Sequence, residues 1–469
     1  MGGACSNLAE LGNPCELGPC VQSANLLLKT TASASAQAIL KLVPGTHFNG
    51  KPVDKVFLKF FVNPQTLPQE MYSFVINQYD IHPKARLFDY ERVVQSLAAM
   101  RYELTIYGSL IQPIMAQHIC PFFTTVFSTG YNCTLKDIEG LVGQVNKEAL
   151  QLAVPQSFVK NPKELIVPKV SNVNLQSLKF CVIASQVGGR MTLKEFLTIK
   201  VVSEQESLEK WFEIMFQVAF GLYVLQLAGV AHNDLHSGNV LVEKLDAPVT
   251  YCLCIGIDSP VYYTFQTQYT VQVYDFDRSS FTAYQNMMVN ERAINLYSAR
   301  IRVVETQDLF RLVFGLLYSL FLNSNILPYV LKILDIVYKE DDIKNKTIEL
   351  VQNTSFLSLN GEELPAEFFT KLQPMRSVLD ELAEKGQVQK ASIRPKSVPN
   401  EQFFMVDSSF FQNGVVKVAT VYNAIEQKQL ETRPIESVDT VTAEQLRNIE
   451  VELTQDEYDM NQLLYRSIK

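Results

Sequence analysis

Two short polar segments carry residue types that are suited to chemistry. The first covers residues 231–242 and reads AHNDLHSGNVLV, and the second covers residues 271–278 and reads VQVYDFDR. Carboxylate and amide groups of this kind orient hydroxyl groups or bind hard cations. The first segment directly follows a long apolar helical stretch and leads into an apolar run, which places its polar residues between buried elements. The alternative is a surface turn rich in polar residues.

Together the two segments resemble the catalytic loop and the metal-binding loop of the protein-kinase superfamily. The first matches H-x-D-L-x-x-x-N, and the second matches D-F-G with Asp277 in place of glycine. The order of helix, catalytic loop, strand pair and metal loop also agrees. Residues 234–239 read DLHSGN and resemble the catalytic loop of haspin-type kinases, and residues 102–107 read YELTIY and resemble a helix of viral kinases. The chain therefore most resembles the atypical Ser/Thr kinases of large nucleocytoplasmic DNA viruses, with a haspin-like catalytic loop.

The resemblance implies an ATP- and Mg²⁺-dependent phosphotransferase. Phosphoryl transfer needs an in-line hydroxyl, a fixed triphosphate and cations that neutralise the transferred group. The resemblance implies that Asp234 orients the substrate hydroxyl and that Asn239 and Asp275 bind magnesium. It makes His232 a structural residue of the loop and Asp308 the buried carboxylate that braces it.

A catalytic lysine is expected on an early strand. Residues 56–61 read VFLKFF and resemble the V-A-I-K strand, whose lysine holds the α- and β-phosphates, so Lys59 is the candidate. Lys41, in the stretch AILK, is a rival. Lys59 is preferred because the loop of small residues at 31–36 must come one strand earlier. The alternative is a lysine on an edge strand with no catalytic role.

The glutamate that would pair with this lysine has two candidates, Glu91 and Glu103, on a helix expected over residues 86–112. Glu103 is preferred because it lies nearer the Pro-containing turn at 119–123, through which kinases return to a strand. The alternative is a glutamate that faces solvent. Pro113 is expected to end the helix.

The resemblance implies two further sets of contacts to ATP. The glycine-rich loop is missing, and small residues take its place: Ser33, Ala34 and Ser35. They would let the backbone approach phosphate less closely than glycine does. A strand over residues 180–184 leads into the expected hinge, whose backbone groups would bind adenine: Ser185, Gln186 and Val187.

Three functions follow from where these motifs match those of protein kinases and where they differ. The leading one is a Ser/Thr protein kinase. His236 replaces the usual lysine and no A-P-E motif follows, which favours a small-molecule phosphotransferase. The missing glycine loop and the long polar tail favour a catalytically weak pseudokinase that serves as a virion or membrane scaffold. Asn233 replaces the arginine of H-R-D, so activation by phosphorylation is not expected.

The elements that position these residues follow from apolar patterning. Strands are expected over residues 25–30, 37–43, 55–62 and 180–184. A helix is expected over residues 207–229, a shorter one from Thr192 with Glu195 in a capping box, and mainly helices over 308–384. Strands with one helix followed by helices predict an α+β fold with two lobes, a β-rich small lobe and a helical large lobe.

The expected division of the chain follows from this order. It comprises an irregular tail over residues 1–22, a small lobe with insertions over 23–186, a large lobe over 187–385 and a C-terminal extension over 386–469. Length and composition agree with a large folded core, since 47% of the 469 residues are hydrophobic.

Charge and cysteine content limit the partners. A net charge of −8 argues against general nucleic-acid binding. The partners that the resemblance implies are ATP and a protein substrate. The eight cysteines form no Cys-x-x-Cys pair and have no zinc spacing, which predicts free thiols in a reducing compartment. Neither of the most apolar stretches, 211–231 and 309–322, reads as a membrane span.

The first six residues, MGGACS, fit a myristoylation pattern at Gly2, with Cys5 available for palmitoylation. Two acyl chains would anchor the chain durably to a membrane. The alternative is a chance match to a short motif. The expected location is intracellular, in the host cytoplasm if the chain is viral, with membrane association or packaging in the virion.

Overall fold

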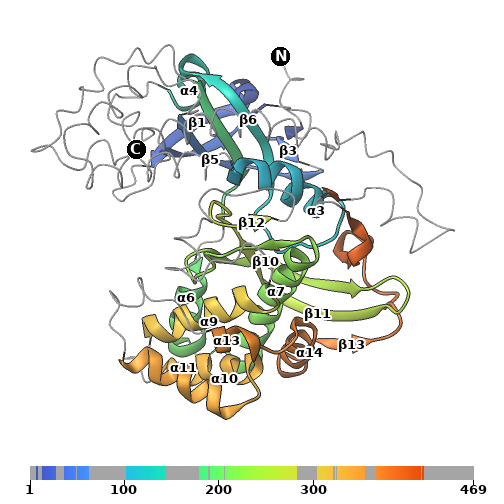
Figure 1. Cartoon of the computed structure of the whole chain (residues 1–469). Helices are drawn as coiled ribbons and strands as arrows, with labels where there is room; N and C mark the ends of the chain where they lie inside the picture. The colour runs from blue at the N-terminus through green and yellow to red at the C-terminus, as the bar shows by residue number, and fades with distance from the viewer. Residues whose placement is uncertain are drawn as a thin grey trace, which may run out of the picture.

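The computed structural model describes residues 7–8, 13–27, 36–48, 50–62, 102–143, 179–188, 191–204, 206–281, 304–320, 323, 325–353, 366–412 and 415–416. Within these residues the chain is mixed α+β, as predicted. A five-stranded antiparallel sheet lies at the top of Figure 1, and the helices of the C-terminal half lie at the bottom. A long hairpin, β10–β11, lies between them.

The five-stranded sheet is built from the predicted strands and one that was not predicted. Its order is β1 (Val21–Leu27), β2 (Ala36–Leu42), β5 (Lys55–Val62), β7 (Lys179–Gln186) and β6 (Val126–Thr134). Every neighbouring pair is antiparallel. The sheet therefore brings the strand that contains Lys59 beside the strand that leads into the expected hinge.

Alternation along β5 decides where Lys59 points. Val56, Leu58 and Phe60 are buried in a cluster on one face of the sheet, so the side chain of Lys59 lies on the other face. That cluster is covered by the 3-10 helix η2 (Pro14–Cys20) and by α4 (Leu135–Val142), which begins with a capping box. Burial thus alternates along the segment, since Phe57 and Lys59 are half-buried between these buried residues.

The N-terminal segment is more ordered than expected. Residues 14–20 form η2, which buries Leu17 and Cys20 against the sheet, so the irregular tail does not extend to residue 22. Gly130 of β6 makes room for this segment, since a Cβ there would lie 2.5 Å from Asn13 Oδ1.

The expectation of free thiols is wrong for three cysteines. Cys15 of η2 and Cys133 of β6 form a disulfide, and Cys20 is also disulfide-bonded. Among the described residues, four buried cysteines keep their thiols: Cys120, Cys181, Cys252 and Cys254. The bonded Cys15 and Cys133 are 118 residues apart in sequence, so their spacing gave no indication of the bond.

The helix that carries Glu103 is described from residue 102 to residue 116 and does not end at Pro113. Its middle is the π-helix η5 (Tyr107–Ile111), and α3 (Gln112–Ala116) continues it. Pro113 stands in the first turn of α3, directly after the wider π turn. Proline is tolerated there because the hydrogen-bond ladder is already shifted.

Helix α7 (Leu208–Leu227) forms as predicted and is the centre of the main core. Ser207 caps its N-terminus. The fully buried Gln217 fixes the helix to strand β11: its amide donates to the carbonyl of Tyr269 at 3.1 Å and accepts from the N–H of Val271 at 3.2 Å. This helix is therefore the support for the strand that leads into Asp275.

A second sheet contains the long hairpin and part of the C-terminal segment. Its order is β13 (Gln389–Ala391), β11 (Val261–Val273), β10 (Val240–Ile255) and β14 (Phe403–Val406). Strand β14 is buried and runs parallel to β10. The C-terminal extension expected from residue 386 thus begins as part of the sheet and the core.

The predicted helical region after residue 307 is also present. Its helices are α9 (Gln307–Leu320), α10 (Leu327–Val337), α11 (Asp341–Asn353), α13 (Ala366–Thr370) and α14 (Met375–Lys385). The predicted capping box of Thr192 and Glu195 opens α6 (Leu193–Glu195), which continues as the π-helix η9 (Phe196–Ser203). None of the helices in the described part of the chain is both long and apolar enough to cross a bilayer.

The remaining elements are short. Strand β8 (Met191–Thr192) pairs with β10, and β9 (Val230–Ala231) pairs with β12 (Ser280–Phe281). The pairing of β9 with β12 joins the start of the first polar segment to the residues that follow the second one. The others are β3 (His47–Phe48), β4 (Lys51–Pro52), η10 (Asn400–Gln402), η11 (Ser408–Phe410), β15 (Phe411–Gln412) and β16 (Val415–Val416).

Candidate functional site

Lys59 of β5 meets two carboxylates from distant parts of the chain. Its Nζ lies 2.5 Å from Glu103 Oε2 and 3.3 Å from Asp275 Oδ1. The Glu103 side chain is 2% exposed, whereas that of Asp275 is 32% exposed. The lysine is therefore held from the buried side by Glu103, and Asp275 keeps access to solvent.

Only one of the two rival residues is described, and it does not lie in this arrangement. Lys41 is exposed on β2, where it stands opposite Lys55 in the register of the sheet. Glu91 lies outside the described residues. The structure thus pairs the preferred lysine with the preferred glutamate.

The loop after β9 is held by Asp308 at the start of α9. One carboxylate oxygen of Asp308 accepts from the N–H of His232 at 2.7 Å, and the other accepts from the N–H of Asn233 at 2.9 Å. Asn233 has a left-handed backbone, with φ of 60°, and its carbonyl accepts from Arg311 at 2.5 Å. These contacts fix the backbone conformation in which Asp234 is presented.

Asp234 and Asn239 lie next to the segment that carries Asp275. The side-chain amide of Asn239 donates to the carbonyl of Asp234 at 3.0 Å, and its backbone carbonyl accepts from the N–H of Tyr274 at 3.2 Å. Arg278, three residues after Asp275, places NH1 3.4 Å from Asp234 Oδ1. The two polar segments predicted from sequence are thus joined by hydrogen bonds and by an ion pair.

The turn at Asp275 and Phe276 has an unusual backbone. Asp275 has a φ of 71°, and its N–H donates to the hydroxyl of Tyr107 at 3.0 Å. The buried ring of Phe276 packs edge-on against the ring of Tyr107 and also contacts the ring of His232. This turn therefore links the helix of Glu103 to the loop of Asp234.

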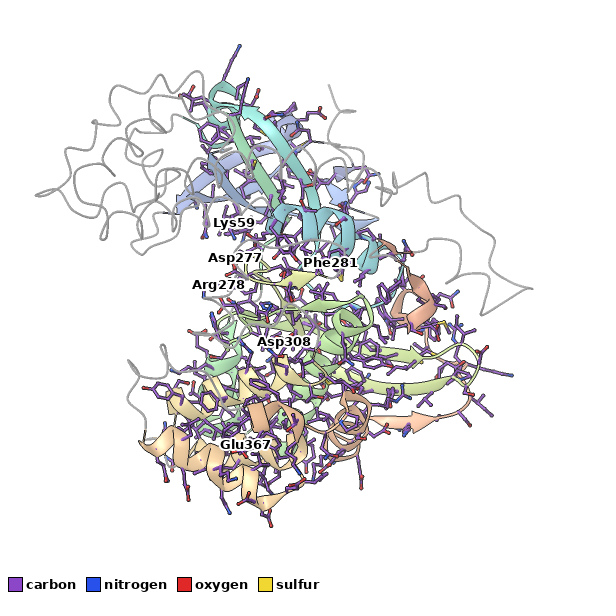
Figure 2. All side chains as sticks on the ribbon, viewed as in Figure 1. Lys59, Asp277, Arg278, Phe281, Asp308 and Glu367 are labelled. Atoms are coloured by element: carbon purple, nitrogen blue, oxygen red, sulfur yellow. A yellow bond between two sulfur atoms is a disulfide. The ribbon has the colours of Figure 1, made fainter. Side chains whose placement is uncertain are left out.

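Figure 2 shows Lys59 at the lower edge of the five-stranded sheet, with Asp277 and Arg278 just below it. Burial alone would lower the pKa of Lys59, but the attraction of Glu103, Asp275 and Asp277 outweighs burial and keeps this pKa well above its usual value. The ammonium group is therefore charged throughout the neutral range.

Two carboxyl groups near Lys59, those of Glu103 and Asp277, have raised pKa values. Burial raises the pKa of Glu103 to about 7, against the opposing attraction of Lys59 and with a reinforcing repulsion from Asp275. Burial, together with the repulsion of Asp275 and Glu103, raises the pKa of Asp277 well above its usual value. A cation bound beside these carboxylates would favour their ionised form, so cation binding and the loss of their protons are coupled.

The residues of the expected hinge lie at the end of β7. The N–H of Gln186 donates to the carbonyl of Thr125 at 2.8 Å, and its side chain reaches Glu243 of β10 at 3.5 Å. Ser185 is buried, and Val187 follows the strand and is half-buried. The backbone N–H of Gln186 is therefore already engaged, which leaves the backbone around Val187 as the more accessible part of this segment.

Several predicted residues lie outside the described part of the chain. They are Ser33, Ala34, Ser35, Gly2 and Cys5. Among the described residues, no group of three or more His, Cys, Asp or Glu side chains is arranged to hold a metal ion by itself.

Sequence reasoning missed Tyr107 and Arg278. Tyr107 stands four residues after Glu103 and thus on the same side of the helix, and this spacing is the signal that could have revealed it. No local sequence pattern indicated the contact of Arg278, because its partner Asp234 is 44 residues earlier in the chain.

No protein-family model matches this chain, and a comparison with curated proteins finds no significant match.

The site combines two binding capacities. Lys59 presents a fixed positive charge, which suits an anion such as a phosphate. Asp275 and Asn239 present hard oxygen ligands, which suit a cation such as Mg²⁺. A ligand that carries both a polyanion and a hard cation matches this arrangement.

Proposed function

We propose that this chain is an ATP- and Mg²⁺-dependent phosphotransferase, and specifically a Ser/Thr protein kinase with a two-lobed kinase-like layout. The observation that carries the proposal is the meeting of Lys59 with Glu103 and Asp275. These residues lie 44 and 216 positions from Lys59. Their types match the three positions that fix the phosphates and the metal in protein kinases.

In this proposal each residue of the cluster has one task. Lys59 binds the α- and β-phosphates, and Glu103 holds the lysine in place from the buried side. Asp275 and Asn239 hold magnesium, whose usual ligands are one or two carboxylates, phosphate oxygens and water. When bound, magnesium neutralises charge on the phosphates.

Asp234 orients the hydroxyl of the substrate. Its carboxylate is 27% exposed, and the loop that presents it is braced by Asp308. Arg278 contacts Asp234 from the exposed side. A substrate hydroxyl would approach from this side, beside the guanidinium group.

A second candidate is a small-molecule phosphotransferase. It is favoured by the exposed imidazole of His236, whose Nδ1 accepts from the N–H of Gly238 at 3.0 Å. This histidine takes the place of the lysine that protein kinases have two residues after the catalytic aspartate.

Acylation at Gly2 and Cys5 stays a prediction, which the intact mass of the protein from its native cell would test.

The test is phosphate transfer from radiolabelled ATP with the full-length chain. Casein and a basic protein are offered as protein substrates, and aminoglycosides as small-molecule substrates. Labelled protein supports the kinase, and labelled aminoglycoside supports the second candidate. No transfer to any substrate, and no autophosphorylation, would contradict both.

Asp234→Asn should abolish this transfer and leave the fold intact, since it removes only the carboxylate that orients the hydroxyl. The matched control is Asp246→Asn, at an exposed aspartate of β10, which should keep full activity. Full turnover by purified Asp234→Asn would show that the role given to Asp234 is wrong.

A further inference from the structure

Tyr107 links the helix that carries Glu103 to the backbone of Asp275. It stands one helical turn after Glu103, and its hydroxyl oxygen accepts the hydrogen bond from the backbone N–H of Asp275 at 3.0 Å. The side chain is buried, with the residue 5% exposed. The tyrosine therefore contacts the backbone of Asp275 directly and does so away from bulk water.

The backbone of Asp275 needs such a contact. Its φ of 71° is in the left-handed region, which costs a residue with a side chain about 1 kcal/mol or more. A conformation of this kind persists when surrounding contacts hold it. Here the contacts are the hydrogen bond to Tyr107 and the packing of Phe276 against the ring of Tyr107, with centroids 5.4 Å apart.

The contributions of the ring and of the hydroxyl of Tyr107 can be tested separately. The ring packs against Phe276, and a phenylalanine would keep that contact. The hydroxyl binds the Asp275 amide, and a phenylalanine would lose that bond. Burial and the nearby charge of Glu103 raise the pKa of Tyr107 well above its usual value, so the hydroxyl stays neutral at working pH.

We propose that the hydroxyl of Tyr107 is a positioning group that holds Asp275 in the conformation that binds the metal. This inference rests on the proposed function and extends it to a residue outside the two polar segments. The hydroxyl acts through Asp275 and does not touch substrate. Its loss should therefore weaken the use of Mg²⁺ and leave the rate at saturating Mg²⁺ largely unchanged.

The test compares wild type with Tyr107→Phe in the full-length chain. Rates of phosphate transfer are measured at saturating ATP over a range of Mg²⁺ concentrations. The apparent affinity for Mg²⁺ should fall about threefold to tenfold, the range that corresponds to one lost hydrogen bond. The rate at saturating Mg²⁺ should stay within about twofold of wild type.

The matched control is Tyr338→Phe. The buried hydroxyl of Tyr338 donates to the carbonyl of Phe368 at 2.6 Å, so this variant also loses one buried hydrogen bond. It should lower the melting temperature about as much as Tyr107→Phe does and leave the Mg²⁺ dependence unchanged. A merely structural role for Tyr107 predicts the same behaviour for both variants.

The outcomes separate this inference from the proposed function. If wild type transfers phosphate and Tyr107→Phe shows an unchanged Mg²⁺ dependence, the positioning role is overturned and the proposed function stands. An equal loss of apparent Mg²⁺ affinity in Tyr338→Phe would also overturn it. If wild type neither binds Mg·ATP in calorimetry nor transfers phosphate, the proposed function fails and the inference fails with it.

Discussion

Three carboxylates attract the single ammonium group of Lys59, and this excess of acidic groups over basic ones determines how the site responds to pH. Lys59 stays charged because Glu103, Asp275 and Asp277 attract its proton. Burial, reinforced by repulsion between the carboxylates, raises the pKa values of Glu103 and Asp277. Without a bound cation, the site therefore tends to keep a proton on one of its carboxylates near neutral pH.

Glu103→Gln should change both activity and the pH dependence of stability. Phosphate transfer should fall by about tenfold to a hundredfold, because a loosened Lys59 stabilises phosphate charge less well. The pKa of Glu103 is about 7 in the folded chain, against a usual value of 4.5. Between these values the folded chain binds more protons than the unfolded one, so the contribution of Glu103 to stability falls as pH rises.

The glutamine side chain of this variant does not titrate, so the free energy of unfolding of the variant should rise relative to that of wild type between about pH 5 and pH 8. Urea denaturation of the unliganded proteins at both pH values measures this change. Glu349→Gln, at an exposed glutamate of α11, serves as the control and should run parallel to wild type. A parallel profile for Glu103→Gln would contradict the raised pKa.

At the scale of single residues, the sequence revealed those that belong to ordered motifs. Asp234, Asn239 and Asp275 stand at spacings that match known loops, so they could be named in advance. The spacing of Tyr107 from Glu103 indicated its side of the helix. Its hydrogen bond to Asp275, and the contact of Arg278 with Asp234, could not be predicted, because each depends on a backbone conformation that only the folded chain shows. The left-handed backbone of Asp275 is the clearest case, since the residue types at this turn do not predict it.

At the scale of elements, a segment near the C-terminus connects two parts of the fold. We call residues 403–410 the C-terminal strap. Its strand β14 pairs with β10, and the N–H of Met405 donates to the carbonyl of His118, just after the helix that carries Glu103. The ring of Phe404 stacks on the ring of His118 and packs against Tyr251 of β10. The strap therefore ties the end of this helix to the second sheet.

Phe404→Ala should lower the free energy of unfolding by about 3 kcal/mol, because it removes a buried aromatic ring between two elements. Chemical denaturation followed by tryptophan fluorescence of Trp211 measures this change. Ile393→Ala is the control, since Ile393 is 79% exposed and its loss should cost no more than about 0.5 kcal/mol. Equal stability of the two variants would show that the strap does not support the fold.

Elements were predictable where one periodic pattern runs unbroken. Helix α7 could be located within two residues at each end, because its apolar residues recur over five turns. Strand β6 could not, because its pairing with β7 shifts register twice and Asn132 has a positive φ. Pro113 was wrongly predicted to end the helix, because the π-helical turn before it could not be predicted from the sequence.

At the scale of the whole molecule, the site exists only because distant segments fold together. Lys59 comes from the N-terminal sheet, Glu103 from the helix beneath it, and Asp275 from the end of the hairpin (Figure 1). Sequence order predicted the α+β class, since order and patterning reflect layers. It did not predict the Cys15–Cys133 disulfide or the return of the C-terminal segment, because both are contacts over long sequence separations.

The most direct test of the central claim is calorimetric titration of the full-length chain with ATP, with and without Mg²⁺. Wild type should bind ATP at least about tenfold more tightly with Mg²⁺ than with EDTA, since the metal joins the phosphates to the Asp275 carboxylate. Asp275→Asn should lose that difference, and Lys59→Met should bind weakly under both conditions. No binding by wild type, or an affinity that Mg²⁺ does not change, would contradict the account.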